Sequence, residues 1–358
     1  MNKITSIIGT VGIPAKYGGF ETLVEHLTKK QGDNYEMIVY CSSKSYNVRL
    51  EKYNNAKLNY INLKANGFQS IPYDIISIFK SFKKSDSLLI LGVSGCLVLP
   101  FIKLISNTKI IVNIDGIEWK RAKWGKFAKC FLKFSEKIAV KYADEIITDN
   151  KIILDYVKSE YDASSHLIAY GGDHVTNESF DDQLIEKYPL VKSDYAFKVC
   201  RIEPENNIHI ILEAFSILPE KNIVCIGNWA NSEYGKNLKM EYAEYKNIFL
   251  LDPIYDQTVL NQFRSNCNLY LHGHSAGGTN PSLVEAMYLG LPIFAYGADY
   301  NKETTENKAI YFNNVNELVS LLKNLDDEQL NNIGRDMNII AKERYTWDYI
   351  STQYSKLF

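Results

Sequence analysis

The sequence predicts an α/β protein with two successive doubly wound domains, each a parallel sheet covered by helices on both faces. Its 358 residues suit two hydrophobic cores better than one. Short, nearly continuous apolar runs, typical of buried parallel strands, alternate with segments of helical periodicity. This pattern restarts after the sequence Tyr170-Gly171-Gly172-Asp173, which predicts a boundary between two domains.

Strands are expected at apolar runs followed by polar or glycine-rich loops. In the first half they are 3–9, 36–41, 57–63, 87–91, 109–114 and 145–148, and in the second half 196–200, 223–226, 248–251, 267–272 and 292–295. Helices are expected at 21–30, 208–217, 258–265 and 282–289, and 335–358 is helical with Trp347, Ile350 and Tyr354 on one face. We therefore expect a Rossmann-like domain over 1–171, a second Rossmann-like domain over 172–340, and a C-terminal helix, 341–358, that packs back on the first domain.

The composition is typical of a globular protein that resides in a reducing compartment. Hydrophobic residues make up 46% and charged residues 23%, which excludes a disordered chain. The six cysteines form no CxxC pair, so a cysteine-rich zinc site is excluded and a disulfide framework is disfavoured. The apolar run at the N-terminus is too short for a signal peptide. The stretch 88–102 is shorter than a membrane span and is interrupted by glycines and Pro100.

The charge is distributed unequally. Up to Tyr170 there are 24 Lys and Arg against 16 Asp and Glu, a net charge of +8, whereas the rest has 16 against 26, or −10. This asymmetry indicates that the first half meets an anionic surface or substrate.

The strongest local motif is HGHSAGGTNPSLVEAMYLGLPIFAYG, His272 to Gly297. A loop containing Gly277, Gly278, Thr279 and Asn280 precedes a helix that starts near Pro281. The free N–H groups of its first turn and the helix dipole suit a diphosphate, and Glu285 could bind a ribose diol. The alternative is a glycine-rich turn followed by a surface Glu.

Three weaker motifs follow predicted strands. GTVGIPAKYGGFET, 9–22, brings Gly18 and Gly19 to a helix start, but its spacing is not that of the dinucleotide fingerprint. NIDGIEWKRAKWG, 113–125, carries Asp115 and Glu118, which could move protons or orient a sugar hydroxyl; equally, the Asp could be a helix cap. In CRIEPENN, 200–207, Arg201 could neutralise a diphosphate or serve only in a salt bridge.

Together with LGVSGC and IAYGGD, these motifs resemble glycosyltransferase family 4, of GT-B architecture, and within it the bacterial polysaccharide β-1,4-rhamnosyltransferases. The resemblance runs from about Ile7 to Phe358. It implies that Glu285 binds the donor ribose and that Arg201 binds the diphosphate. The family's first motif Glu is replaced by Gly277, and Asn206 and Asn207 stand where the family has a Lys. Asp115 falls where many relatives have a catalytic histidine or aspartate.

The resemblance further implies a retaining transfer from dTDP-β-L-rhamnose to a polyprenyl-diphosphate-linked saccharide. No cofactor or metal is expected beyond the nucleotide-sugar donor, and nucleic acid is not expected as a partner. We also assign His272, His274 and Trp119 to acceptor or sugar binding. Alternatives are a family 4 enzyme using UDP-glucose or a similar donor, a nucleotide-sugar epimerase, and a non-enzymatic nucleotide-sugar-binding scaffold.

Residues 120–143 predict a basic amphipathic helix. Its aromatic stripe is Trp124, Phe127, Phe131, Phe134 and Ile138, and the opposite face carries Lys126, Lys129, Lys133 and Lys137. We expect the aromatic side chains to pack into the core and the lysines to lie on anionic lipid without insertion. Lys80, Lys83 and Lys84 add to this charge. The protein is accordingly expected in the cytoplasm, peripherally bound to the inner face of the plasma membrane.

Overall fold

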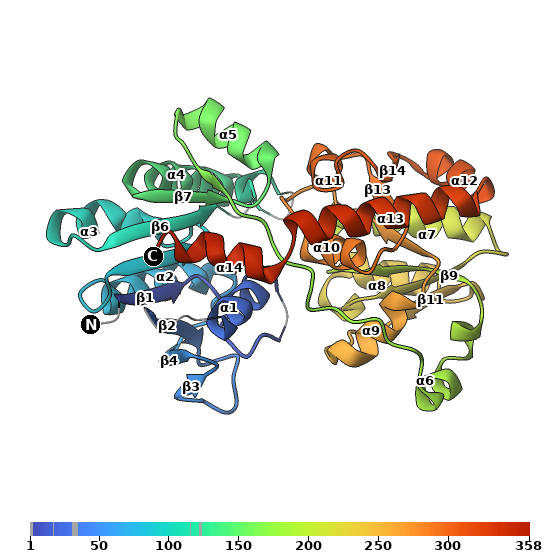
Figure 1. Cartoon of the computed structure of the whole chain (residues 1–358), viewed down its shortest axis with the longest axis horizontal. Coiled ribbons are helices and arrows are strands. Elements are labelled where there is room, and N and C mark those ends of the chain that lie inside the picture. Colours follow the sequence, from blue (N-terminus) through green and yellow to red (C-terminus); the bar gives the residue numbers. More distant parts are fainter. Residues whose placement is uncertain (1–2, 17, 31–34, 115, 122–123) are drawn as a thin grey trace. The chain divides into compact units, whose positions relative to one another are not determined.

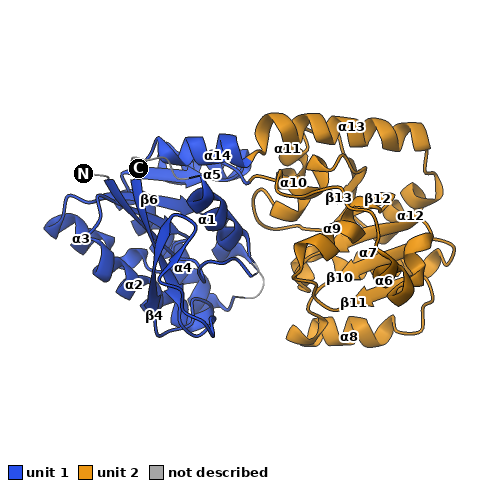
Figure 2. Ribbon diagram, turned by 60° about the horizontal axis from the view of Figure 1, so that its bottom comes forward, with its two compact units in different colours: residues 1–170, 347–358 blue, residues 171–346 orange. Residues whose placement is uncertain are grey.

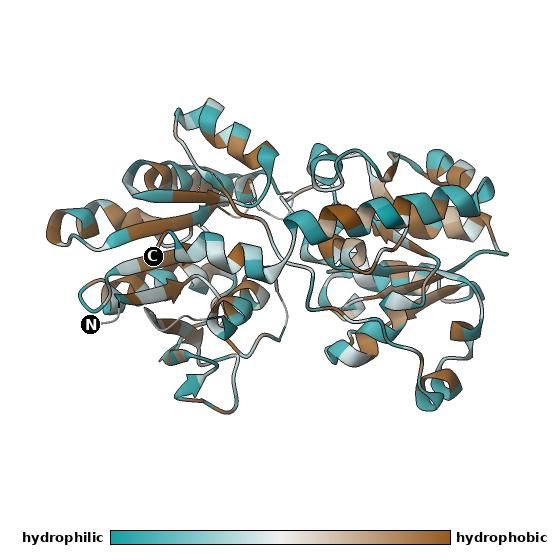
Figure 3. Cartoon of the chain, in the orientation of Figure 1, coloured by the Kyte–Doolittle hydropathy of each residue, from teal (hydrophilic) through white to brown (hydrophobic). Residues whose placement is uncertain are grey.

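The computed structural model describes residues 3–16, 18–30, 35–114, 116–121 and 124–358 (Figure 1). The chain forms two compact units (Figure 2). Unit 1 consists of Met1–Tyr170 together with Trp347–Phe358, and unit 2 consists of Gly171–Thr346. Each unit has one sheet of largely hydrophobic strands, which are brown in Figure 3.

The sheet of unit 1 has the strand order β3-β4-β2-β1-β5-β6-β7-β8. All neighbours pair in parallel except β3 and β4. The strands are β1 (Lys3–Ile8), β2 (Tyr35–Ser42), β3 (Lys52–Tyr53), β4 (Ala56–Ile61), β5 (Ser87–Leu91), β6 (Lys109–Ile114), β7 (Glu145–Thr148) and β8 (His166–Leu167).

The helices of unit 1 are α1 (Gly19–Lys29), α2 (Ser70–Ser81), α3 (Leu99–Ile105), α4 (Lys126–Tyr142), α5 (Lys151–Tyr161) and α14 (Trp347–Ser355). Short 3-10 helices lie at η1 (Gly67–Gln69), η2 (Cys96–Val98) and η3 (Glu118–Lys120). The C-terminal α14 packs on α1, where Trp347 stacks on His26 with ring centroids 4.2 Å apart. Tyr354 Oη accepts a 2.6 Å hydrogen bond from Nδ2 of Asn113, a residue of β6.

The sheet of unit 2 is parallel throughout, in the order β11-β10-β9-β12-β13-β14. Its strands are β9 (Tyr195–Val199), β10 (Asn222–Ile226), β11 (Ile248–Leu251), β12 (Leu269–His272), β13 (Ile293–Tyr296) and β14 (Ile310–Phe312). The helices are α6 (Asp182–Lys187), α7 (Ile208–Ile217), α8 (Glu233–Glu241), α9 (Gln257–Ser265), α10 (Pro281–Tyr288), α11 (Asp299–Thr304), α12 (Val315–Lys323) and α13 (Asp327–Arg344). The 3-10 helices are η4 (Pro189–Lys192), η5 (Pro204–Asn206) and η6 (Trp229–Asn231).

The predicted fold class is confirmed, with two doubly wound α/β units. The segment expected to be helical from Arg335 to the C-terminus is interrupted at Tyr345 and Thr346, which separate α13 from α14. The short strands β3, β8 and β14 were not expected, because two or three residues are too few to produce a recognisable strand pattern.

The expected orientation of α4 is wrong. Its buried residues are Leu132, Ser135, Glu136 and Ala139, whereas Phe127 is 95% and Phe134 is 55% exposed. Apart from Leu132, the buried side chains of α4 are small or polar. Ser135 Oγ donates to the carbonyl of Val93, and the carboxylate of Glu136 accepts hydrogen bonds of 2.5 Å from two tyrosine hydroxyls of α5, Tyr156 and Tyr161. Aromatic spacing alone therefore selected the wrong side of the helix.

None of the helices within the described residues is long and apolar enough to cross a membrane.

Candidate active site

The principal candidate site lies at the carboxyl end of β12 in unit 2. The strand ends at the buried His272, a loop runs over 273–280, and α10 begins with Pro281. Asn280 has an extended backbone before the helix, and its side chain makes no capping hydrogen bond. Pro281 has no N–H, and the amides of Leu283 and Val284 donate to the carbonyl of Asn280 at 3.0 and 3.2 Å. The positive end of the helix dipole still faces the loop, an arrangement that favours anions.

This loop is held from two sides. The amide and hydroxyl of Ser275 both donate to the carbonyl of Glu205 at 2.9 Å, and Asn207 Nδ2 donates to the carbonyl of Gly273 at 2.8 Å. A Cβ at Gly273 would lie 2.2 Å from the carbonyl oxygen of Asn206, so only glycine fits there. By contrast, Gly277 has φ +126°, and a Cβ there would meet only Asn280 Nδ2, at 3.9 Å. The loop is therefore packed tightly at its start and has more space at Gly277.

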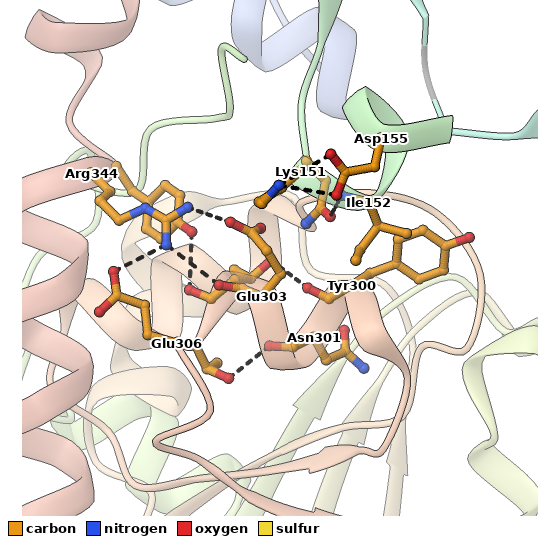
Figure 4. Close-up of polar contacts among 12 residues, drawn as sticks. Lys151, Ile152, Asp155, Tyr300, Asn301, Glu303, Glu306 and Arg344 are labelled. Atoms are coloured by element: carbon orange, nitrogen blue, oxygen red, sulfur yellow. Dashed lines mark hydrogen bonds and ion pairs between the residues drawn. The ribbon is translucent and has the colours of Figure 1, made fainter. Parts of the chain in front are cut away.

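Helix α11 supports the other side of the loop. Asn301 Nδ2 donates to the carbonyls of His274 and Tyr296, both at 2.8 Å. The helix is in turn held by Arg344 at the end of α13, which contacts Glu303 at 2.6 Å and Glu306 at 3.1 Å (Figure 4). These polar contacts give the loop a rigid support of secondary structure, which is what positioning of a ligand requires.

Glu285 lies one turn into α10 and forms the most developed charge cluster of the site. Arg264, from α9, approaches Glu285 Oε2 through Nη2 at 2.5 Å, and His174 Nε2 lies 3.3 Å from Oε1. The Arg264 side chain is only 2% exposed, and the Glu285 side chain 12%. His174 reaches the carboxylate because Gly172 lies against the carbonyl of Val284, where a Cβ would be 2.5 Å away.

The electrostatics of this cluster keep Glu285 ionised. Burial raises the pKa of its carboxyl, but Arg264 and His174 together lower that pKa below the usual value. Arg264 is itself oriented by Asn261 Oδ1, which accepts from Nη1 at 2.8 Å. An ionised carboxylate held this firmly is suited to accept hydrogen bonds from a pair of hydroxyl groups.

Arg201 is placed just after β9, at the same strand ends as the β12 loop. Its side chain is exposed and forms no ion pair with any residue of the described chain. Asn206 Nδ2 donates to the carbonyl of Arg201 at 2.6 Å, and Asn207 adopts a left-handed φ of 47°. The two asparagines at the expected lysine position therefore fix the backbone around Arg201 and the β12 loop.

His272 and His274 stack on each other, with ring centroids 4.4 Å apart. Neither ring nitrogen of the fully buried His272 has a hydrogen-bond partner among the described residues. Burial, and then the charge of Lys198, lower the pKa of His272 well below its usual value, so its imidazole is neutral. A neutral imidazole can donate or accept a hydrogen bond with a sugar hydroxyl.

Lys198 was missed by the sequence reasoning. This residue of β9 is 1% exposed, and its Nζ has no hydrogen-bond partner within the described part of the chain. In the register of the sheet it lies beside Cys225 of β10. The surrounding sequence, YAFKVC, predicts a strand, but nothing in this pattern indicates that its lysine is buried.

In unit 1, the glycine-rich loop after β1 is bound by the protein's own Glu21. Its Oε1 accepts from Thr10 Oγ1 at 3.0 Å and from the amide of Val11 at 2.7 Å. Gly18 has φ +133° and a Cβ there would lie 1.9 Å from Glu21 Oε2, while Gly19 begins α1. Glycine at position 18 is thus required for the close approach of this carboxylate.

The second predicted motif of unit 1 is described only in part, since Asp115 lies outside the described residues. Glu118 accepts a 2.9 Å hydrogen bond from Trp124 Nε1 and is ion-paired with Arg121 at 2.8 Å. Its carboxylate therefore contacts both Arg121 and Trp124. The indole Nε1 of Trp119 is buried, and the ammonium of Lys133 lies 4.5 Å from the Trp119 ring centroid.

The four lysines expected to face the membrane differ in their surroundings. Lys126 and Lys137 are exposed, and Lys129 is half-buried. Lys133 instead donates to Tyr156 Oη at 2.9 Å and to Glu160 at 2.6 Å. The ammonium group of Lys133 therefore binds side chains of unit 1 itself.

Asp74 of α2 is a second residue missed by the sequence reasoning. It is 3% exposed, and its Cβ lies against Gly95 in the loop that follows β5. Burial raises the pKa of Asp74 to about 8, partly opposed by a hydrogen bond with Ser94. The carboxyl is therefore mainly protonated at neutral pH.

Metal-ligating side chains do not gather in the described structure: no group of three or more His, Cys, Asp or Glu residues there could hold a metal ion.

Comparison with known proteins identifies the class of the second unit. Residues 180–342 match the family Glycosyl transferases group 1, and residues 2–173 match a domain of unknown function, DUF1972. The glycosyltransferase match thus covers most of unit 2, and the DUF1972 match covers most of unit 1.

Individual relatives agree with this class. The protein CapJ of Staphylococcus aureus is 24% identical over 279 residues, covering 74% of this chain and 68% of CapJ. Sucrose-phosphate synthase of Thermosynechococcus elongatus has a TM-score of 0.81 at 15% identity, over 100% of this chain and 98% of the other. HepE of Anabaena, in complex with UDP-glucose, has a TM-score of 0.77 at 15% identity, over 99% and 98%. The two solved structures show that the chain has the GT-B fold.

Proposed function

We propose that the protein is a retaining glycosyltransferase that transfers L-rhamnose from dTDP-β-L-rhamnose to a saccharide carried by polyprenyl diphosphate. The product would be a β-linked rhamnoside used in capsular or cell-wall polysaccharide. The observation that carries the proposal is Glu285, held ionised by Arg264 and His174 at the start of α10 in the group 1 glycosyltransferase domain.

The donor would bind with its ribose hydroxyls on Glu285 and its diphosphate at the N-terminus of α10. Arg201 would neutralise the diphosphate as it leaves, because its exposed guanidinium follows β9 and has no ion-pair partner among the described residues. Gly278, Thr279 and Asn280 line the approach to the helix.

In the reaction, the bond from the anomeric carbon to the diphosphate oxygen breaks, and the acceptor oxygen forms a bond on the same face. The departing diphosphate takes the proton of the acceptor hydroxyl, so no protein nucleophile is required. The protein contributes positioning and charge stabilisation. Since Gly277 has no side chain to contact the sugar, we assign this contact to Asp115, with His272 and His274 as further sugar-binding candidates and Trp119 for the acceptor.

Transfer from UDP-glucose or a related donor is the second candidate. It is favoured by the similarity to HepE, whose structure contains UDP-glucose.

The test is calorimetric titration of the full chain with dTDP, UDP, dTDP-rhamnose and UDP-glucose, followed by measurement of nucleotide release with and without a lipid-diphosphate saccharide. We expect tighter binding of the dTDP compounds and release only with acceptor. Preference for UDP-glucose would replace the donor assignment, and turnover without acceptor would contradict transfer.

Asp115→Asn provides a second test, because it retains the shape and removes the charge. We expect transfer to fall by about two to four powers of ten, while nucleotide affinity and melting temperature remain unchanged. Full activity would contradict the assignment of Asp115, and loss of both affinity and stability would make it structural.

A further inference from the structure

Large apolar side chains lie exposed on three helices of unit 1. Phe79 of α2 is 41% exposed, Phe101 and Leu104 of α3 are 51% and 83% exposed, and Phe127 of α4 is 95% exposed. Ile76, Ile105 and Phe134 belong to the same set. Figure 3 shows α3 coloured largely brown. We call these seven residues the apolar surface of unit 1.

The three helices are neighbours, so this surface is continuous across at least two of them. The rings of Phe79 and Phe101 have centroids 6.0 Å apart and thereby join α2 to α3, and α3 packs on α4. Along α4, the exposed positions Phe127, Cys130, Phe134 and Lys137 follow helical spacing and define one face. A monomeric protein seldom exposes so many large apolar groups in one region unless they contact a partner.

The charge around this surface is mainly positive. Lys80, Lys83, Lys84, Lys126, Lys137 and Lys141 are exposed on these helices or directly after them. Within α2, α3 and α4 the two acidic residues, Asp74 and Glu136, are buried. Two exposed acids follow the helices: Asp86 after α2, and Asp144 after α4, which is ion-paired with Lys103 of α3. A surface that combines exposed phenylalanines and leucine with lysines is complementary to an anionic lipid interface, where apolar groups enter the acyl boundary and ammonium groups meet the phosphates.

We infer that α2, α3 and α4 form a membrane-binding surface that inserts its apolar side chains into an anionic bilayer. This differs from attachment by the lysines of α4 alone, because Phe101, Leu104 and Phe127 would penetrate the interface. The inference deepens the proposed function, which places the acceptor on a lipid, but it requires no sugar transfer and can be tested without donor or acceptor.

The experiment is flotation of the full chain with two kinds of vesicle. One contains phosphatidylcholine alone, and the other also contains roughly 30 mol% phosphatidylglycerol, which gives the anionic surface that attracts basic residues. We expect binding to the anionic vesicles, weakened by salt. Phe101→Ser/Leu104→Ser should reduce the partition coefficient about tenfold or more. Lys83→Glu/Lys84→Glu should reduce it to a similar extent and remove much of its salt dependence.

Matched controls lie in unit 2. Met240→Ser/Ile339→Ser removes two exposed apolar side chains, and Lys192→Glu/Lys246→Glu reverses two exposed lysines. Both controls should bind vesicles like the wild type. If the α3 variant fails to fold, as judged by its melting curve, Phe127→Ser/Phe134→Ser tests the same surface on α4.

Equal vesicle binding by wild type, α3 and α4 variants would overturn the insertion. Absence of wild-type binding would also overturn membrane insertion. If the substitutions instead convert a dimer into a monomer, the surface binds a second copy of the chain and the inference is wrong. Binding of dTDP or UDP, measured separately, should be unchanged in every variant, which distinguishes failure of this inference from failure of the proposed donor site.

Discussion

Arg264 Nη2 and Glu285 Oε2 are 2.5 Å apart, although the two residues come from different helices, α9 and α10. Arg264 is almost completely buried, and its Nε has no partner among the described residues. A buried guanidinium that loses its carboxylate is left uncompensated, which costs far more than an exposed ion pair contributes. Glu285 therefore combines a structural role with its proposed role in donor binding.

Glu285→Ala is accordingly expected to destabilise the protein by about 3 kcal/mol, measured by urea unfolding. Glu285→Gln retains a hydrogen-bond acceptor for Arg264 and should lose less. The double variant Arg264→Leu/Glu285→Leu should recover most of the loss, since it removes both charges. A Glu285→Ala protein as stable as the wild type would contradict this coupling.

Donor affinity is tested best with Glu285→Gln. Removing the charge should weaken binding of the nucleotide by about ten- to a hundredfold, the value of one charged hydrogen bond, in a calorimetric titration. Glu233→Gln is the matched control, because Glu233 is an exposed carboxylate of α8. Unchanged affinity in folded Glu285→Gln would exclude Glu285 from the donor site.

Arg201→Ala should lower kcat about a hundredfold or more, because the charge that Arg201 meets grows as the diphosphate leaves. Arg201→Lys should recover only part of this loss, since lysine lacks the bidentate fork. The stability of Arg201→Ala should differ little from that of the wild type, because the Arg201 side chain is exposed and forms no ion pair within the described structure. Normal turnover of Arg201→Ala at saturating donor would assign the diphosphate to another group.

How far the sequence predicts this structure depends on the range of the interactions involved. The strands β5, β6 and β7 have the predicted bounds, because buried parallel strands produce continuous apolar runs. The loop before α10 was likewise recognisable from its glycines and Pro281. Neither prediction needs any contact distant in the sequence.

Contacts between distant residues account for what was missed. Glu136 can be buried in α4 because Tyr156 and Tyr161 of α5 donate to it, and helical periodicity carries no information about these partners. The pairing of Arg264 with Glu285 spans 21 positions between two helices and had no local signal either. Asp74 and Lys198 are buried for the same reason, through the packing of the sheets around them.

Asp74 makes stability depend on pH. Its pKa is raised to about 8 in the fold, against about 3.9 in an unfolded chain. Between these values the native state holds a proton that the unfolded state has lost. This contribution is therefore largest at low pH and falls as pH rises from about 4 to 8, with a limiting slope of about 1.4 kcal/mol per pH unit.

Asp74→Asn removes this dependence. Its free energy of unfolding, minus that of the wild type, should increase between pH 5 and 8, measured by urea unfolding at each pH. Asp86→Asn is the control, because Asp86 is exposed at the edge of β5. A pH-independent difference for Asp74→Asn would show that the carboxyl is ionised in the native state.

Lys198→Met tests a buried charge without a protein partner. The substitution retains the length of the side chain and removes an ammonium group that is 1% exposed and has no hydrogen bond within the described residues. Because a buried polar group without a partner costs about 1–3 kcal/mol, we expect the free energy of unfolding to rise by about that amount. Lys192→Met, at an exposed position, should leave it unchanged. Nucleotide affinity should be the same in both variants. Lower stability of Lys198→Met would contradict the cost assigned to the buried ammonium, and a loss of dTDP or UDP binding would instead place Lys198 at the donor diphosphate, beside Arg201.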